Sequence, residues 1–267
     1  MSAAAGQARF GRRFAVLFAA GFLGILSLAS TLPDMLRSAP IPPEARAALP
    51  PMPVLVALSL IQPTLLMAGA VALGLALAPP LGLRSHLAES AAGEAPGLRA
   101  VPRQAPLALA LGGAASAAVL ALDAWVFRPW MGAAGEALAI TGERGVAVTL
   151  AGMLYGGITE ELMLRWGILS LLAWAGWKLF RRGHGEPGAP VMWAATTLAA
   201  LLFGAGHLGA VSAVAPLTAA VVARTVALNA LAGVAFGWLF WRRSLEAAML
   251  AHMAGHVVFT LASLAGA

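Results

Sequence analysis

The amino-acid sequence predicts an all-α membrane protein, a polytopic bundle of about seven transmembrane helices. Of its 267 residues, 60% are hydrophobic and only 10% are charged, whereas soluble domains have about 45–50% apolar and about 25% charged residues. At least five stretches reach the length of about 20 mostly apolar residues that crosses a bilayer. Membrane lipid is therefore the first partner that the sequence predicts.

The first predicted span is the apolar run 14–32, which follows Arg9, Arg12 and Arg13. A secretory signal has a shorter apolar core of about 7–15 residues, so we interpret this run as a transmembrane helix. The hydrophilic segment 79–104, which contains His86, is expected to be an exposed loop. Six further apolar runs predict the later transmembrane spans, which cover residues 54–78, 106–126, 145–179, 190–208, 216–241 and 244–264.

Basic residues fall in alternate loops, and they orient the chain because Lys and Arg accumulate on the cytoplasmic side. With the N-terminus inside, four cations lie outside: Arg37, Arg46, Arg128 and Arg144. Eleven lie inside: Arg9, Arg12, Arg13, Arg84, Arg99, Arg103, Lys178, Arg181, Arg182, Arg242 and Arg243. The prominence of Ala, Gly, Leu and Arg beside one lysine is typical of a GC-rich genome. We therefore expect a bacterial cytoplasmic membrane and a cytoplasmic N-terminus.

Composition also excludes several classes of function. The chain has no cysteine, which rules out disulfides, thiolate metal sites and a cysteine nucleophile. Its net charge of +6 is small and no basic run has interleaved aromatic residues, so we expect no nucleic-acid partner. Neither a phosphate-binding glycine loop nor a dinucleotide fingerprint is present.

A few polar residues fall at membrane depth, where a charge costs about 2.5–3.5 kcal/mol and marks a candidate functional site. Asp123 and Arg224 lie in the outer halves of their spans, where they can snorkel or pair, and both are interpreted as structural residues. The other candidates are Glu160, Glu161, Arg165, His207, Asn229, His252 and His256.

The stretch YGGITEELMLRWG, residues 155–167, holds three of these candidates. Glu161 and Arg165 are four residues apart and can form a salt bridge on one helix face. Glu160 lies about 100° away around the helix, which leaves it without a partner on its own helix. His252 and His256 are also four residues apart, and small residues near them and near His207 allow close helix approach. We expect the three histidines to converge with Glu160.

A glutamate with two or three histidines suits the activation of water for hydrolysis. Glu160 can act as a general base, and imidazoles can orient the water or stabilise an oxyanion. Alternatively, Glu160, His207 and His252 can hold a divalent metal such as zinc, with one position open for water. Counting about 1.5 Å per residue, Glu160 lies about 22 Å from Gly145 and His252 about 12 Å from Ser244. That depth predicts a site nearer the cytoplasmic face, although His207, about 26 Å from Pro190, does not fit it.

Three motifs resemble those of the CPBP intramembrane proteases, the family of the CAAX prenyl endopeptidases and the Abi-type bacteriocin self-immunity proteins. They are Glu160-Glu161-x-x-x-Arg165, Phe203-x-x-x-His207 and His252-x-x-x-His256. The resemblance covers about residues 145–259. We therefore expect one membrane domain over 1–267, with three motif-free helices in 1–144 and a four-helix catalytic core in 145–267.

The resemblance implies an intramembrane endopeptidase that cleaves a peptide or protein substrate. Glu160 and His207 would activate the water, His252 and residue 256 would stabilise the oxyanion, and Glu161 and Arg165 would support the site. The family usually has Asn or Asp where this chain has His256, which could donate a hydrogen bond or bind a metal. Intramembrane Glu and His also occur in proton-coupled transporters, and a non-catalytic protease-like scaffold is a third reading.

Overall fold

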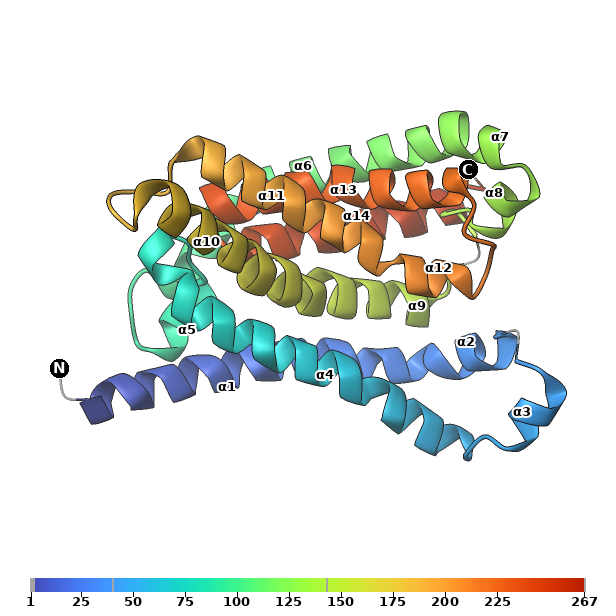
Figure 1. Ribbon diagram of the computed structural model, residues 1–267, viewed down its shortest axis with the longest axis horizontal. Coiled ribbons are helices and arrows are strands. Elements are labelled where there is room, and N and C mark those ends of the chain that lie inside the picture. Colours follow the sequence, from blue (N-terminus) through green and yellow to red (C-terminus); the bar gives the residue numbers. More distant parts are fainter. Residues whose placement is uncertain (1–2, 40, 143, 267) are drawn as a thin grey trace.

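The computed structural model describes residues 3–39, 41–142 and 144–266, and these residues contain helices and no strands. The helices run nearly parallel to the long axis of the molecule, as Figure 1 shows, with the N-terminus at one end and the C-terminus near the other. We call these ends the N-terminal face and the opposite face. The predicted all-α polytopic bundle is confirmed.

Six helices in the described chain are long and apolar enough to cross a membrane. Their apolar spans cover Gly6–Ser30, Met52–Leu77, Gly97–Met131, Gly188–Ser212, Ala219–Arg242 and Leu245–Leu264. The helices that supply them are α1 (Ala3–Ser27), α4 (Met52–Leu77), α6 (Val101–Leu122), α11 (Gly188–Gly206), α13 (Ala219–Arg242) and α14 (Leu245–Leu264). The chain is therefore a multi-pass membrane protein.

The remaining span of the seven expected is a helix with altered winding. It consists of α9 (Val146–Ala151), η5 (Gly152–Glu160), η6 (Leu162–Leu169) and α10 (Ser170–Arg181), which follow one another without a loop. Both η5 and η6 are π-helical, with hydrogen bonds from residue i to i+5, a geometry that is rare and concentrates at functional sites. The Glu160-Glu161-x-x-x-Arg165 motif lies in this π-helical stretch.

Short elements cover both ends of the bundle. At the opposite face they are η1 (Leu28–Ser30), α2 (Leu32–Ser38), α3 (Pro43–Ala47), η4 (Asp123–Phe127), α7 (Arg128–Met131), α8 (Ala133–Ala137) and α12 (Leu208–Ser212). At the N-terminal face they are η2 (Pro79–Leu81), α5 (His86–Ala91) and η3 (Gly97–Ala100). The elements at the two faces therefore differ, and only those at the opposite face reach the cavity described below.

The segment 79–104 is not the exposed loop that its sequence predicted. Glu246, at the start of α14, accepts hydrogen bonds from Ser85 Oγ at 2.6 Å, His86 N at 2.9 Å and Leu87 N at 3.0 Å. His86 is buried, with its Nδ1 2.8 Å from Glu89 Oε2. The expectation failed because a carboxylate from a distant helix caps α5, a contact that the local sequence does not reveal.

The motif-free N-terminal helices pack directly against the helices that carry the motifs. Thr159 Oγ1 donates to the carbonyl of Gly21 at 2.7 Å, which joins η5 to α1. At the contact of α6 with α14, a Cβ on Gly112 would overlap the backbone of Ala251. Residues 3–142 therefore help to hold the positions of both histidine-bearing and glutamate-bearing helices.

Candidate active site

Glu161 and Arg165 form the ion pair that their spacing predicts, with Arg165 Nη1 3.0 Å from Glu161 Oε1. The same carboxylate oxygen lies 2.8 Å from His252 Nδ1. Because a carboxylate can only accept, Nδ1 of His252 carries a proton. Glu161 therefore fixes the ring of His252, a contact that sequence spacing did not reveal.

Arg165 is enclosed on all sides although it is charged. Its Nη2 donates to the carbonyl of Gly233 at 3.0 Å, and its guanidinium lies 5.1 Å from the ring centroid of Phe203 and 5.6 Å from that of Phe236. Cation–π contacts of this kind stabilise a cation that is shielded from water. Together with Glu161 it forms a neutral, buried unit.

Glu160 is turned away from this unit and lines a cavity of about 710 Å³ together with His207, His252 and His256. Its side chain is 16% exposed, whereas that of Glu161 is fully buried. The Oε2 atom of Glu160 lies 4.0 Å from Nε2 of His252. The structure thus separates the two adjacent glutamates, one buried in an ion pair and one facing a cavity.

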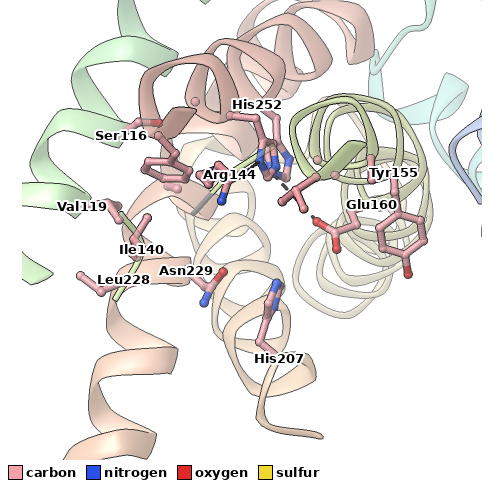
Figure 2. A pocket seen from close by; sticks show the side chains of 18 of the residues that line it. Ser116, Val119, Ile140, Arg144, Tyr155, Glu160, His207, Leu228, Asn229 and His252 are labelled. Atoms are coloured by element: carbon pink, nitrogen blue, oxygen red, sulfur yellow. Dashed lines mark hydrogen bonds and ion pairs between the residues drawn. The ribbon is translucent and has the colours of Figure 1, made fainter. Parts of the chain in front are cut away.

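His207 reaches the cavity from the C-terminal end of α11 and points toward Glu160 across it (Figure 2). Its Nδ1 lies 2.9 Å from the carbonyl oxygen of Phe203. A carbonyl can only accept, so Nδ1 carries the proton and, in the neutral ring, Nε2 keeps its lone pair. His207 therefore offers a hydrogen-bond acceptor.

His256 has the opposite tautomer. Nη2 of Arg144 lies 3.1 Å from Nδ1 of His256, and because a guanidinium only donates, Nδ1 must accept. The proton of the neutral ring is then at Nε2. Partial burial lowers the pKa of the Arg144 guanidinium from its ordinary value, but a guanidinium stays protonated in proteins. His256 therefore offers a hydrogen-bond donor.

The rings of His252 and His256 stack with centroids 5.2 Å apart, and Phe236 stacks on His252 at 4.8 Å. Gly156 in η5 makes room for them. A Cβ on Gly156 would lie 2.6 Å from Nε2 of His256 and 3.3 Å from Nε2 of His252. The Nε2 atoms of both histidines therefore lie against the π-helical segment at Gly156.

The residues expected to hold a metal do not form a metal-binding cluster. Within the described ranges, no group of three His, Asp or Glu side chains is arranged to hold a metal ion. His207 and His252 each donate Nδ1–H to an oxygen, as metal-ligating histidines also do. The poor fit to a zinc set therefore rests on the spacing of Glu160, His207 and His252 alone.

The depth of the site differs from the sequence estimate. The cavity is lined by residues of the opposite face, including Thr31, Asp34 and Ile140, so the expectation of a site near the N-terminal face is wrong. Two features explain the error. A π-turn takes more residues than an α-turn, so Glu160 lies less deep from Gly145 than an α-helix would place it. In addition, α11 ends short of the opposite end of the bundle (Figure 1), which places His207 inside it.

Sequence reasoning missed Arg144 and Tyr155, which line the cavity together with Asn229. Asn229 had been noted at membrane depth, and its Nδ2 donates to the carbonyl of Thr225 at 2.8 Å. Arg144 had been assigned to a loop, and the sequence around it does not indicate that its side chain contacts the cavity. Asp123 and Arg224, which were interpreted as structural residues, pair with each other, since Arg224 Nε donates to Asp123 Oδ1 at 2.6 Å.

Comparison with known families supports the same part of the chain. Residues 142–258 match the family described as type II CAAX prenyl endopeptidase Rce1-like. Comparisons with curated proteins and with solved structures gave no match. The matched segment contains the three motifs and every histidine of the cavity. Residues 142–258 are therefore similar to the Rce1-like CAAX prenyl endopeptidases, in agreement with the resemblance that the three motifs carry.

Proposed function

We propose that this protein is an intramembrane endopeptidase that hydrolyses peptide bonds with a water activated by Glu160 and His207. One observation carries the proposal. Arg165 and His252 both contact Glu161, while the neighbouring Glu160 faces a cavity that three histidines also line. A carboxylate kept free of a cation on its own helix is available as a general base.

The tautomers suggest how the water is held. Glu160 and Nε2 of His207 are both acceptors, so one water can donate one hydrogen to each and direct a lone pair at a peptide carbonyl. Glu160 takes the proton as the water oxygen bonds to the carbonyl carbon. The negative charge then develops on the former carbonyl oxygen, where preorganised donors lower the barrier.

His256 supplies such a donor through Nε2–H, and Arg144 acts as a positioning residue because it fixes this tautomer. When the carbon–nitrogen bond breaks, Glu160 returns its proton to the leaving amine and the oxyanion re-forms the carbonyl group. The new carboxylic acid then loses its remaining proton to solvent. His252, oriented by Glu161, places its Nε2 in the same cavity, 4.0 Å from Oε2 of Glu160. In this chain a histidine with an arginine partner thus performs the task of the family's usual Asn or Asp.

We propose that the reaction proceeds without a metal ion. The support is the spacing of the side chains, since Glu160, His207 and His252 are not grouped closely enough within the described ranges to hold a metal ion. We further propose that the protein lies in a bacterial cytoplasmic membrane with its N-terminus inside. The excess of cations at the N-terminal face supports this orientation.

A cleavage assay in heavy-oxygen water tests the proposed function. The purified protein in lipid vesicles is given a library of membrane-inserted peptides, and the products are identified by mass spectrometry. We expect new carboxyl termini that carry one heavy oxygen from the solvent. Absence of cleavage across the library would contradict hydrolysis, and proton or ion flux in the same vesicles would favour a transporter instead.

A further inference from the structure

The cavity that contains Glu160 extends to only one face of the bundle. Its lining includes residues from η1 and α2, among them Ser30, Thr31 and Asp34, and residues 138–140 with Arg144. All of these belong to the opposite face, and no described residue of the loops at the N-terminal face contributes to the lining. Water and substrate can therefore reach Glu160 from the opposite face.

Between Glu160 and the N-terminal face the bundle is densely packed and apolar. Leu162, Leu169 and Leu239 are fully buried there, and Trp166 meets Phe240 edge-on with ring centroids 6.1 Å apart. Beyond this core, the Glu246 carboxylate holds the segment 85–87 against the start of α14. A close-packed interior of this kind leaves no passage for a peptide.

The two faces also differ in charge. The N-terminal face holds the eleven cations counted above and the opposite face four. Without Arg9, Arg12 and Arg13 the balance is still eight (11 − 3) against four. Cytoplasmic loops carry the excess of Lys and Arg. The face that the cavity reaches is thus extracytoplasmic by the same orientation that we propose for the chain.

Exposed tryptophans mark the membrane boundary on that side. Trp125 is 81% exposed and Trp130 is 61% exposed, on η4 and α7 at the opposite face. Tryptophan concentrates at the level of the lipid headgroups. Residues 138–140, which line the cavity, follow α8, the next element after α7. The mouth of the cavity therefore lies near the same level, within reach of both lipid and water.

We propose that the substrates are membrane-inserted peptides cleaved in the extracytoplasmic half of the bilayer. This inference rests on the proposed function for its chemistry, but the side from which the site is reached rests on the cavity, the packed core and the charges alone. Access from the opposite face excludes cytosolic polypeptides as substrates, because they would have to pass through the packed core to reach Glu160.

The absence of cysteine allows a direct test with single cysteines and a charged, membrane-impermeant maleimide. Ser30→Cys lies at the mouth of the cavity, and Ser90→Cys is a matched exposed serine at the N-terminal face. In intact bacterial cells we expect labelling of Ser30→Cys and none of Ser90→Cys. In inverted membrane vesicles we expect the reverse.

A third variant reports on the cavity itself. Ala232→Cys lies in the cavity wall one turn from Asn229, and a small charged thiosulfonate should modify it in intact cells and not in inverted vesicles. Modification from the vesicle side alone would overturn the inference, as would labelling of Ser30→Cys there alone. These readouts do not depend on cleavage, so the loss of all peptidase activity would sink the proposed function and leave this result standing.

Discussion

Nδ1 of His252 lies 2.8 Å from the same oxygen of Glu161 that Arg165 approaches to 3.0 Å. This shared contact gives the two adjacent glutamates different roles. Glu161 joins the π-helical span to α14 inside the bundle, whereas Glu160, one residue earlier, is left to the cavity. The predictions below follow from this division.

Glu161→Gln should destabilise the fold because it leaves the buried Arg165 without its counter-ion. Removing one partner of a buried ion pair costs about 3–5 kcal/mol. Thermal unfolding of the purified protein in detergent measures the loss as a fall in Tm. Glu186→Gln, an exposed change in the loop before α11, is the matched control, and equal Tm values for the two variants would contradict the role of Glu161.

Gly156→Ala should preserve the fold but displace the rings of His252 and His256, since its Cβ would lie 2.6 Å from Nε2 of His256. A misplacement of about 1 Å can cost about 10²-fold in rate. The measurement is kcat for peptide cleavage. Gly113→Ala on α6 is the control because a Cβ there meets no atom within 4 Å; a similar kcat for both variants would refute the placement.

His256→Ala should lower kcat by about 10²–10³-fold, the usual effect of removing one oxyanion donor. His256→Asn should retain most of the activity, because its amide N–H₂ can donate in place of Nε2–H. His184→Ala, in an exposed loop, should leave kcat unchanged. If Asn and Ala at position 256 are equally inactive, His256 does not act as a simple donor.

Arg144→Met tests whether Arg144 acts through the tautomer of His256. It should lower kcat in the wild-type background, where Arg144 forces the proton to Nε2, and have little effect in the His256→Asn background. A double-mutant cycle on kcat measures this coupling. An equal loss in both backgrounds would mean that Arg144 serves the site in another way.

Metal removal should leave cleavage unchanged. The expected result is full activity after dialysis against a chelator and no stoichiometric zinc in the purified protein by elemental analysis. Activity that is lost on chelation and restored by added zinc would contradict the metal-free proposal and favour the Glu160, His207 and His252 ligand set.

Residue spacing was sufficient to predict the Glu161–Arg165 pair, because both residues lie on one helix and obey local geometry. It also predicted most of the span limits to within a few residues, since apolar run lengths determine them, but α1 begins at Ala3, well before the predicted start at Phe14. It did not predict that Glu161 holds His252 or that Glu246 caps α5, because these contacts join helices 91 and 159–161 residues apart. The estimate of how deep Glu160 lies was wrong for a further reason, because the apolar pattern of a sequence does not distinguish a π-helix from an α-helix.

The most direct test of the central claim is the rate of peptide cleavage by Glu160→Gln, measured at the same folded fraction as the wild type. Gln keeps the size of the side chain but cannot accept a proton from water, so the account predicts a normal Tm with cleavage lost. Cleavage at the wild-type rate by a folded Glu160→Gln protein would contradict it.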